Sequence, residues 1–202
     1  MKIICVGRNY AKHAKEMNSD IPQTPVIFMK PKTALLANGL TFYYPEFSSN
    51  IHYEGEIVLR ISKSAKSLAP KRVKDFIDGV SVGIDFTARD IQSKCKEKGL
   101  PWELAKSFDF SAAIGDFVDF DPDKFEQSEI KVVRNGEMVQ HGYARDMIFG
   151  INDLVSFISH RITLHKGDLI YTGTPEGVGP VSKGDIFELF LNDNRLLMTD
   201  IK

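Results

Sequence analysis

Cysteine is scarce in this sequence, and its two residues, Cys5 and Cys95, lie far apart in unlike contexts. This scarcity excludes a disulfide framework and a cysteine-rich zinc site, and it favours a reducing compartment. No apolar run approaches the length of a membrane-spanning helix, and the opening MKIICVGRNY holds too short an apolar run for a signal peptide. We therefore expect a cytoplasmic protein without a membrane partner.

A surplus of charge of either sign is also missing. The chain has 26 basic and 27 acidic residues, so its formal net charge is −1. This balance gives no long-range attraction to nucleic acid, and no stripe combines basic with aromatic residues, so nucleic acid is excluded as a partner. Repeats, low-complexity segments and linkers are absent from the sequence as well. The 202 residues therefore predict one domain, 1–202, that can bury its own core.

Strand patterns are frequent, whereas helical patterns are few and short. The predicted strands are 2–6, 26–30, 50–61, 79–86, 184–191, 195–201 and one that runs from 167 into the loop 171–179, with a hairpin over 130–140 around Asn135-Gly136. The predicted helices are 67–79 with Val73, Phe76 and Ile77 facing inward, 87–99 with Gly99 as its stop, and 152–161 capped by Asn152. Because strands rarely alternate with helices, we expect an α+β fold with a β-rich core.

The strand 50–61 raises a question, since it carries Glu54 and Glu56 two residues apart. Residues i and i+2 of a strand share a face. The two faces are His52, Glu54, Glu56, Val58 and Arg60 on one side and Tyr53, Ile57, Leu59 and Ile61 on the other. Two interpretations stay open here: a half-exposed strand whose polar side meets water, or two carboxylates that converge on a cation.

Asp85 interrupts the apolar strand 79–86. An isolated ionised carboxylate in apolar surroundings is costly, so proteins pair it, protonate it or bind it to a metal. One alternative is a strand-end aspartate bonded to backbone amides or to Arg89. The other is a third carboxylate beside Glu54 and Glu56, and such an all-oxygen set suits a hard divalent cation such as Mg²⁺ or Mn²⁺.

Two further segments, the loop 171–179 and the segment that carries His13 and Glu16, have polar groups that could bind an anion or act as a general base. In the loop YTGTPEGVG, 171–179, backbone N–H groups and a threonine hydroxyl can converge on an anion, although an ordinary tight turn explains the composition equally well. The loop lacks the Gly-Lys-Ser/Thr ending of a nucleotide triphosphate site. His13 and Glu16 lie one helical turn apart, which is the arrangement of a general base and its orienting carboxylate or of a solvated surface pair.

In combination these features resemble the fumarylacetoacetate hydrolase family, above all its short acylpyruvate hydrolases and oxaloacetate decarboxylases. The motifs run in order through nearly the whole chain: GRNYAKHAKE, IFMKP, HYEGEIVL, GIDFTARDIQ, KGLPWELAKSFD, VRNGEMVQ, DMIFGINDLVSFIS and LHKGDLIYTGTPEGVGPVSKGD. The resemblance implies a mixed β-sandwich roll of the family's C-terminal-domain type with a few short helices, and it implies a homodimer.

The resemblance also implies roles for individual residues. Glu54, Glu56 and Asp85 match the metal ligands, with Mg²⁺ the usual ion and Mn²⁺ possible. The catalytic group comprises Lys106 beside the metal and His13 with Glu16 on a mobile lid, 8–20, and the substrate-binding group comprises Arg89, Gln92, Thr174, Arg8 and Lys30.

The function implied in this way is Mg²⁺-dependent cleavage of a C–C bond in a small 2-oxo acid, either acylpyruvate hydrolysis or oxaloacetate decarboxylation, through the enolate of pyruvate. One alternative is a 2-hydroxyhepta-2,4-diene-1,7-dioate isomerase or decarboxylase of aromatic catabolism, which uses the same enol chemistry. A more remote alternative is a non-catalytic module that binds a metal or a carboxylate.

Overall fold

The computed structural model describes residues 1–17 and 20–202, and a mixed sheet forms the centre of the described part. In spatial order its strands are β2 (Val26–Lys30), β1 (Ile3–Gly7), β12 (Leu169–Tyr171), β5 (Gly55–Ile61), β6 (Ile77–Asp85), β8 (Ala112–Ile114) and β3 (Leu35–Ala37), and β9 (Val118–Asp119) also pairs with β6. β1 runs parallel to β12, with Ile3 opposite Leu169, so the first strand of the chain lies beside a strand from its last quarter.

Two smaller sheets complete the β structure of the described residues. An antiparallel sheet contains β11 (Glu137–Tyr143), β10 (Glu129–Arg134), β14 (Ile186–Leu191) and β15 (Asn194–Asp200), and a short one contains β13 (Gly179–Pro180), β4 (Ile51–Tyr53) and β7 (Thr87–Ala88). The predicted hairpin is confirmed: β10 and β11 turn at Asn135-Gly136, where both residues have positive φ, as a tight hairpin turn requires.

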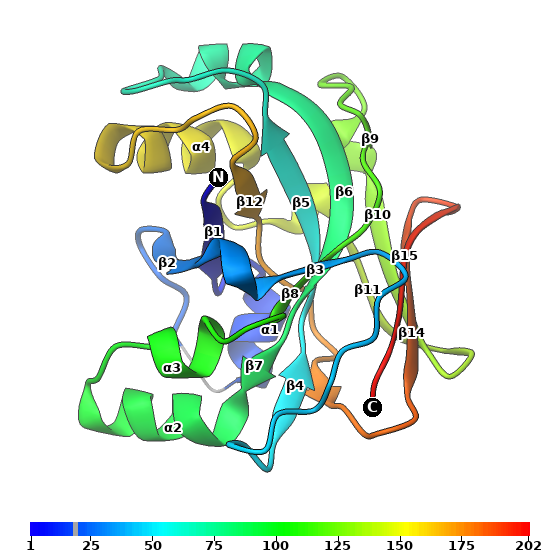
Figure 1. Ribbon diagram of the computed structural model, residues 1–202. Helices are drawn as coiled ribbons and strands as arrows, with labels where there is room; N and C mark the ends of the chain where they lie inside the picture. The colour runs from blue at the N-terminus through cyan, green and yellow to red at the C-terminus, as the bar shows by residue number, and fades with distance from the viewer. Residues whose placement is uncertain (18–19) are drawn as a thin grey trace.

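Short helices surround the sheets. They are α1 (Ala11–Glu16), α2 (Arg89–Lys98), α3 (Glu103–Lys106) and α4 (Ile151–Arg161), with the 3₁₀ helices η1 (Lys32–Ala34), η2 (Pro70–Phe76), η3 (Phe125–Gln127) and η4 (Ala144–Asp146). α4 lies at one end of the central sheet and α2 with α3 at the opposite end, as Figure 1 shows. The α+β class and the family's mixed-sheet fold are therefore confirmed.

Two helix predictions need correction. The segment 67–79 is no α-helix, because η2 is a 3₁₀ helix and Ile77 already begins β6, where pairing with β5 competes with helix formation. Val73 is nevertheless buried, and Phe76 packs against the core. α4 begins one residue earlier than predicted, with Gly150 as its N-cap, so Asn152 lies inside the first turn and caps nothing.

The strand predicted over 50–61 is interrupted at Glu54, which divides it into β4 and β5. β4 pairs with β13 and β7, whereas β5 belongs to the central sheet, so the interruption is the place where the chain changes sheets. Within β5 the alternation holds, since Ile57 and Leu59 enter the main core while Val58 enters a smaller apolar cluster. The main core joins side chains of the central sheet, such as Ile57, to those of the four-stranded sheet, such as Leu189, and of α4, such as Ile158.

In the part of the chain that the structure describes, no helix is long and apolar enough to cross a membrane. Cys5 and Cys95 are both buried and free, which agrees with the expectation that they form no disulfide.

Candidate active site

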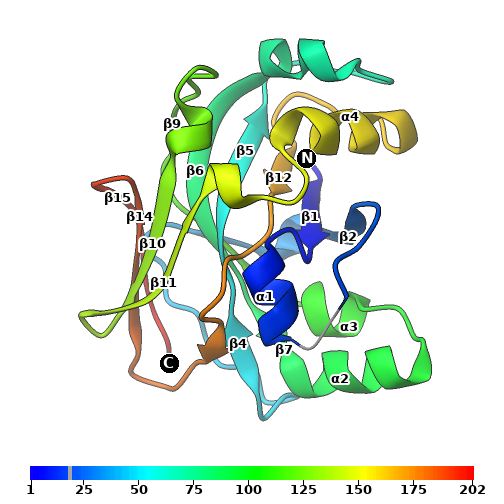
Figure 2. The same cartoon turned by 180° about the vertical axis from the view of Figure 1, so that it is seen from behind.

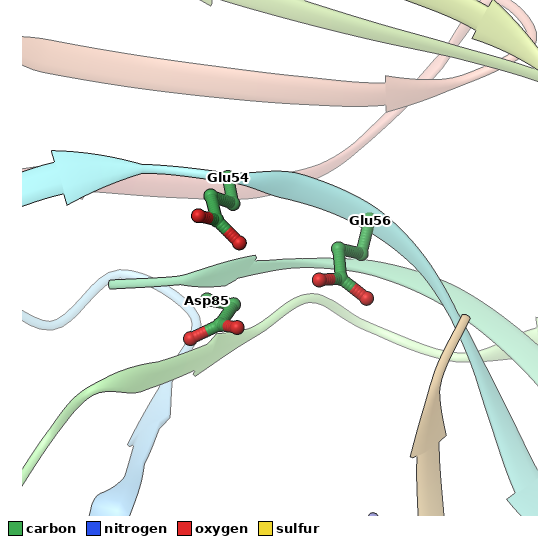
Figure 3. A group of neighbouring side chains, drawn as sticks. All are labelled: Glu54, Glu56 and Asp85. Carbon is green, nitrogen blue, oxygen red and sulfur yellow. The ribbon is translucent and has the colours of Figure 1, made fainter. Parts of the chain in front are cut away.

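Three buried carboxylates meet where β4 passes into β5 beside the end of β6. One oxygen from each of Glu54, Glu56 and Asp85 lies within 4.8 Å of the others, and all three side chains are buried. Figure 3 shows Glu54 and Glu56 on one stretch of ribbon and Asp85 on its neighbour, with their carboxylates gathered in one region. The interpretation of a half-exposed strand with its polar side in water is therefore wrong.

Two buried lysines neutralise much of this negative charge. Lys106, at the end of α3, donates to Glu54 Oε2 at 2.8 Å, to Asp85 Oδ2 at 2.7 Å and to Thr87 Oγ1 at 2.6 Å. Lys30, at the end of β2, pairs with Asp85 Oδ1 at 2.7 Å and also donates to the backbone carbonyls of Phe86 and Lys106. Asp85 is therefore held by two ammonium groups and is not paired with Arg89.

Arg89 and Gln92 lie together at the start of α2. Arg89 Nη2 contacts Glu54 Oε1 at 2.5 Å, and its Nη1 donates to Gln92 Oε1 at 2.6 Å. Both side chains are buried. Arg89 is thus a third positive charge at the carboxylate cluster, and Gln92 orients it.

The pKa values of the two buried glutamates shift in opposite directions. Burial raises the pKa of Glu54, but the positive charges of Lys106 and Arg89 outweigh it and hold this pKa well below its usual range. Burial and the neighbouring charges of Asp85 and Glu54 raise the pKa of Glu56 well above its usual range. Glu56 therefore lacks a compensating positive charge, which a divalent cation would supply.

The glycine-rich loop after β12 approaches Glu56 directly. The backbone N–H of Gly173 donates to Glu56 Oε2 at 2.6 Å. Gly173 has a φ of +103°, and a Cβ there would lie 2.7 Å from Cβ of Asn9, so no other residue fits. The side chain of Asn9 in turn donates to the carbonyl of Thr172 at 2.8 Å. The backbone amide of Gly173, within the predicted anion-binding loop, therefore binds a carboxylate of the protein itself.

Thr174 is buried in the same loop and contacts a glutamine from β11. Gln140 Nε2 donates to Thr174 Oγ1 at 2.8 Å and to the carbonyl of Pro175 at 2.9 Å. Gln140 Oε1 accepts from the backbone N–H of Gly55 at 2.9 Å, between the two glutamates. A single buried amide thus links the loop to the carboxylate-bearing strand.

His13 and Glu16 lie on α1, against the same site. Nδ1 of His13 is 3.0 Å from Glu16 Oε2, and Glu16 Oε1 accepts from the N–H of Gly177 at 3.0 Å. His13 is buried whereas Glu16 is exposed, so the pair lies at the boundary between the site and solvent. Figure 2 shows α1 beside the segment between β12 and β13 to which Glu16 is bonded. Of the predicted lid 8–20, residues 18–19 lie outside the described residues.

His13 of the pair and Glu54 of the cluster line one small pocket of about 30 Å³. Its lining residues are Gly7, Arg8, His13, Met17, Phe28, Glu54, Arg89, Gln92, Lys96, Trp102 and Lys106. Arg8, one of the predicted substrate-binding residues, has a φ of 60°, a strained conformation for a residue with a side chain. Strain of this kind concentrates at functional sites, and here it lies at the pocket.

The comparisons with known proteins decide the family. The profile described as "Fumarylacetoacetate (FAA) hydrolase C-terminal" matches residues 2–199. This chain belongs to the fumarylacetoacetate hydrolase family. Human oxaloacetate tautomerase FAHD1, a mitochondrial protein, is 43% identical over 190 residues, which cover 92% of this chain and 85% of that one. The Arabidopsis thaliana oxaloacetate tautomerase FAHD1 is 44% identical over 91% of this chain and 82% of its own length.

Solved structures of the family superpose on the whole chain. Fumarylpyruvate hydrolase from Pseudomonas aeruginosa, in complex with Mn²⁺ and pyruvate, has a TM-score of 0.93 and 35% identity, covering 100% of this chain and 89% of that one. The 2-hydroxyhepta-2,4-diene-1,7-dioate isomerase from Mycobacterium marinum has a TM-score of 0.86 and 34% identity, covering 99% and 73%. These relatives are enzymes, and so is this member of the fumarylacetoacetate hydrolase family.

The cluster fits the divalent cation expected of such an enzyme. Three carboxylates offer the oxygen ligands that Mg²⁺ and Mn²⁺ prefer, and their oxygens lie within reach of one ion. Glu56, the carboxylate with the fewest positive neighbours, is the one whose pKa is raised by repulsion from Asp85 and Glu54 as well as by burial. The donor set therefore suits a divalent metal.

Sequence reasoning missed the roles of Gln140 and Asn9. Gln140 ends the motif VRNGEMVQ, whose pattern predicts only a hairpin, although a glutamine on an apolar strand is a signal of a buried partner. Asn9 lies in GRNY and bonds to the backbone of two distant segments. Neither partner set is visible in the sequence, because both join residues far apart in the chain.

Proposed function

We propose that this enzyme acts on small 2-oxo acids with the help of a divalent cation, and that it forms and consumes the enolate of pyruvate or of oxaloacetate. One observation supports this proposal above all. His13, which is bonded to Glu16, and Glu54, which belongs to the buried carboxylate cluster, line the same pocket, so a candidate general base lies beside a candidate cation site. The relatives include an oxaloacetate tautomerase and a fumarylpyruvate hydrolase, and both of these activities concern 2-oxo acids.

The charge of the site suits a dianionic substrate. The three carboxylates face three positive side chains, Lys30, Lys106 and Arg89. A divalent cation held by Glu54, Glu56 and Asp85 leaves the site with a net positive charge. Such a field attracts small carboxylic acids of opposite charge, so it favours oxaloacetate or a dicarboxylic acylpyruvate over a neutral compound.

The bound cation, Mg²⁺ or Mn²⁺, would act as a Lewis acid that polarises the 2-oxo group of the substrate. The ammonium of Lys106 has three protons, which all point to protein acceptors in this structure. A contact of Lys106 with the developing negative charge of the substrate therefore requires the exchange of one of these bonds. Lys30 has its donors directed at Asp85 and at backbone carbonyls, which favours a role in holding Asp85 over a contact with substrate.

In acylpyruvate hydrolysis we propose His13 as the general base. The carboxylate of Glu16 accepts from Nδ1 of His13, which leaves Nε2 free to take a proton from water. The hydroxide adds to the distal carbonyl carbon, the bond between C3 and that carbon breaks, and its electron pair forms the enolate of pyruvate. Protonation of C3 then releases pyruvate, and the acyl part leaves as a carboxylate.

Oxaloacetate requires no water. In decarboxylation the bond from C3 to the distal carboxylate breaks, CO₂ leaves, and the same enolate is protonated at C3. In tautomerisation a proton moves between the enol oxygen and C3 without any C–C cleavage, and the tautomerase relatives favour this reaction as a second candidate. Arg89, Gln92, Thr174 and Arg8 are proposed to bind the substrate carboxylates, and their positions around the cluster and its loop support this.

The pocket supports the proposal that 8–20 is a lid. The pocket has a volume of only about 30 Å³. His13 and Arg8 form part of the pocket wall, so a shift of the α1 segment enlarges it. A homodimer and a cytoplasmic location stay predictions.

The test is to measure the loss of acetylpyruvate, of keto-oxaloacetate and of enol-oxaloacetate with and without Mg²⁺ or Mn²⁺, for the wild type and His13→Ala. We expect His13→Ala to lose acetylpyruvate hydrolysis while cation-dependent decarboxylation survives. If the wild type consumes none of the three compounds, the diene-dioate isomerase or a binding module replaces this proposal, and turnover of a 2-hydroxyhepta-2,4-diene-1,7-dioate separates those two.

A further inference from the structure

The orientation of the Gln140 side-chain amide is determined by its neighbours. The backbone N–H of Gly55 can only donate, so the amide atom that faces it at 2.9 Å is the oxygen. The carbonyl of Pro175 can only accept, so the atom that faces it at 2.9 Å is the NH₂ group. Gln140 is 2% exposed, so water does not compete for these bonds.

This orientation determines what the hydroxyl of Thr174 can do. The second N–H of Gln140 points to Thr174 Oγ1 at 2.8 Å, so the hydroxyl oxygen accepts there. The hydroxyl proton must then point elsewhere. Among the described residues its nearest recorded acceptor is the carbonyl of Pro175 at 3.4 Å, which is long and already receives the first N–H of Gln140.

We infer that Gln140 is a positioning residue which keeps the hydroxyl of Thr174 as a hydrogen-bond donor toward the substrate carboxylate. This role rests on the proposed function, in which Thr174 binds that carboxylate. A hydroxyl that donates to an anion stabilises it, whereas a hydroxyl whose proton is taken by a protein acceptor presents only lone pairs and repels it.

The same amide also joins the substrate loop to the cation site. Gly55 lies between Glu54 and Glu56, and Gly173, one residue before Thr174, donates to Glu56. A Cβ at residue 55 would lie 2.3 Å from a side-chain methyl of Val132, so the backbone here is closely packed. Gln140 therefore places the donor hydroxyl at a constant position relative to the carboxylates.

The experiment is a double-mutant cycle of Gln140→Glu and Thr174→Val, with the binding of pyruvate to the Mn²⁺-loaded protein measured by calorimetry. Gln140→Glu keeps an oxygen for Gly55 but replaces the donor to Thr174 by an acceptor. We expect each single variant to weaken pyruvate binding by about 10-fold or more, the value of a hydrogen bond to a charged group. The double variant should bind no more weakly than Thr174→Val alone, because the effect of Gln140 passes through the hydroxyl.

Further controls separate this role from a structural one. Thr174→Ser keeps the hydroxyl and should bind pyruvate nearly as the wild type does. For oxaloacetate turnover the two single variants should raise KM more than they lower kcat. If Gln140→Glu fails to fold, Gln140→Met takes its place in the same cycle, since it removes the donor without adding an acceptor, and its loss should likewise vanish in Thr174→Val.

Additive losses in the cycle would overturn the role of Gln140, even if the wild type binds pyruvate and consumes oxaloacetate as proposed. A wild type that neither binds pyruvate with Mn²⁺ nor consumes oxaloacetate would overturn the proposed function and this role together. The two failures are therefore distinguishable.

Discussion

Glu54 of the carboxylate cluster and His13 of the His13–Glu16 pair line one pocket, but the cluster and the pair are held in different ways. Each carboxylate of the cluster comes from strand or strand-end backbone in the sheets and has partners with a full charge or a backbone N–H. The pair lies on α1, a helix of six residues, which contacts the loop after β12 through the bond between Glu16 and Gly177 and the ion pair of Lys12 with Glu176.

The difference separates two tasks of an active site. A cation site needs several charges at constant distances, which paired strands provide. A general base that lines a small pocket must let the substrate enter, which favours an element that can move. Substitutions in the carboxylate cluster should therefore lower both stability and turnover. Substitutions in the His13–Glu16 pair should lower the turnover of hydrolysis alone.

The largest effect is expected from Glu56→Gln. This change removes one oxygen ligand charge, so cation-dependent turnover should fall on the order of 10³-fold, as when a charge-stabilising group is removed from an active site. Titration of the variant with Mn²⁺ should show weaker binding. Glu188→Gln, which changes an ion pair of β14 with Arg195, is the control and should leave turnover unchanged. Full activity in Glu56→Gln would contradict the cation site.

A large loss of stability is expected from Lys106→Met. It leaves Glu54 and Asp85 without one of their buried partners, which should lower the free energy of unfolding by about 3–5 kcal/mol. Chemical denaturation in EDTA measures this loss. Lys131→Met is the matched control, since Lys131 pairs with Glu129 at the surface, where water screens the charges, and its loss should be much smaller. Equal losses of unfolding free energy in Lys106→Met and Lys131→Met would show that the buried ion pairs stabilise the fold no more than a surface pair does.

A selective effect on rate is expected from Glu16→Gln. Without the charge that orients His13 and stabilises its protonated form, kcat for acetylpyruvate should fall about 10- to 100-fold, a part of the roughly 10²- to 10⁴-fold contribution of a general base. Oxaloacetate decarboxylation should change little. Glu176→Gln, whose carboxylate pairs with Lys12 at 3.2 Å nearby, should leave both rates intact. An equal loss of rate in both reactions would indicate that Glu16 contributes to cation binding, as the carboxylate cluster does, and not to the general base alone.

The smallest effect is a pH-dependent shift in Tm. The folded pKa of Glu56 is raised by burial and by Asp85 and Glu54, so ionising it destabilises the cation-free protein as pH rises above the usual glutamate value. In EDTA, Glu56→Gln should therefore have a higher Tm than the wild type, by a few degrees at about pH 8 and by less at about pH 5. If the Tm difference between Glu56→Gln and the wild type grew toward low pH, it would contradict the prediction that ionised Glu56 destabilises the cation-free protein.

Much of the fold could be predicted from local pattern. The hairpin at Asn135-Gly136 and the end of α2 at Gly99 followed from the backbone preferences of glycine and asparagine. The 3₁₀ helix η2 and the interruption at Glu54 could not be predicted, because in both places pairing with a distant strand overrides local preference. The cap of α4 was wrong by two residues, and the structure shows no side chain of the described residues capping it.

The sequence by itself determined the family, the α+β class and the residue types of the site, because motifs and alternation are properties of neighbouring residues. Only the tertiary structure decided which lysine pairs with which carboxylate and why Glu54 and Glu56 differ in pKa. It also decided how Gln140 reaches both Gly55 and Thr174. These are contacts between segments far apart in the chain. They depend on strand register and burial, which set distance and desolvation, and neither is written in any local pattern.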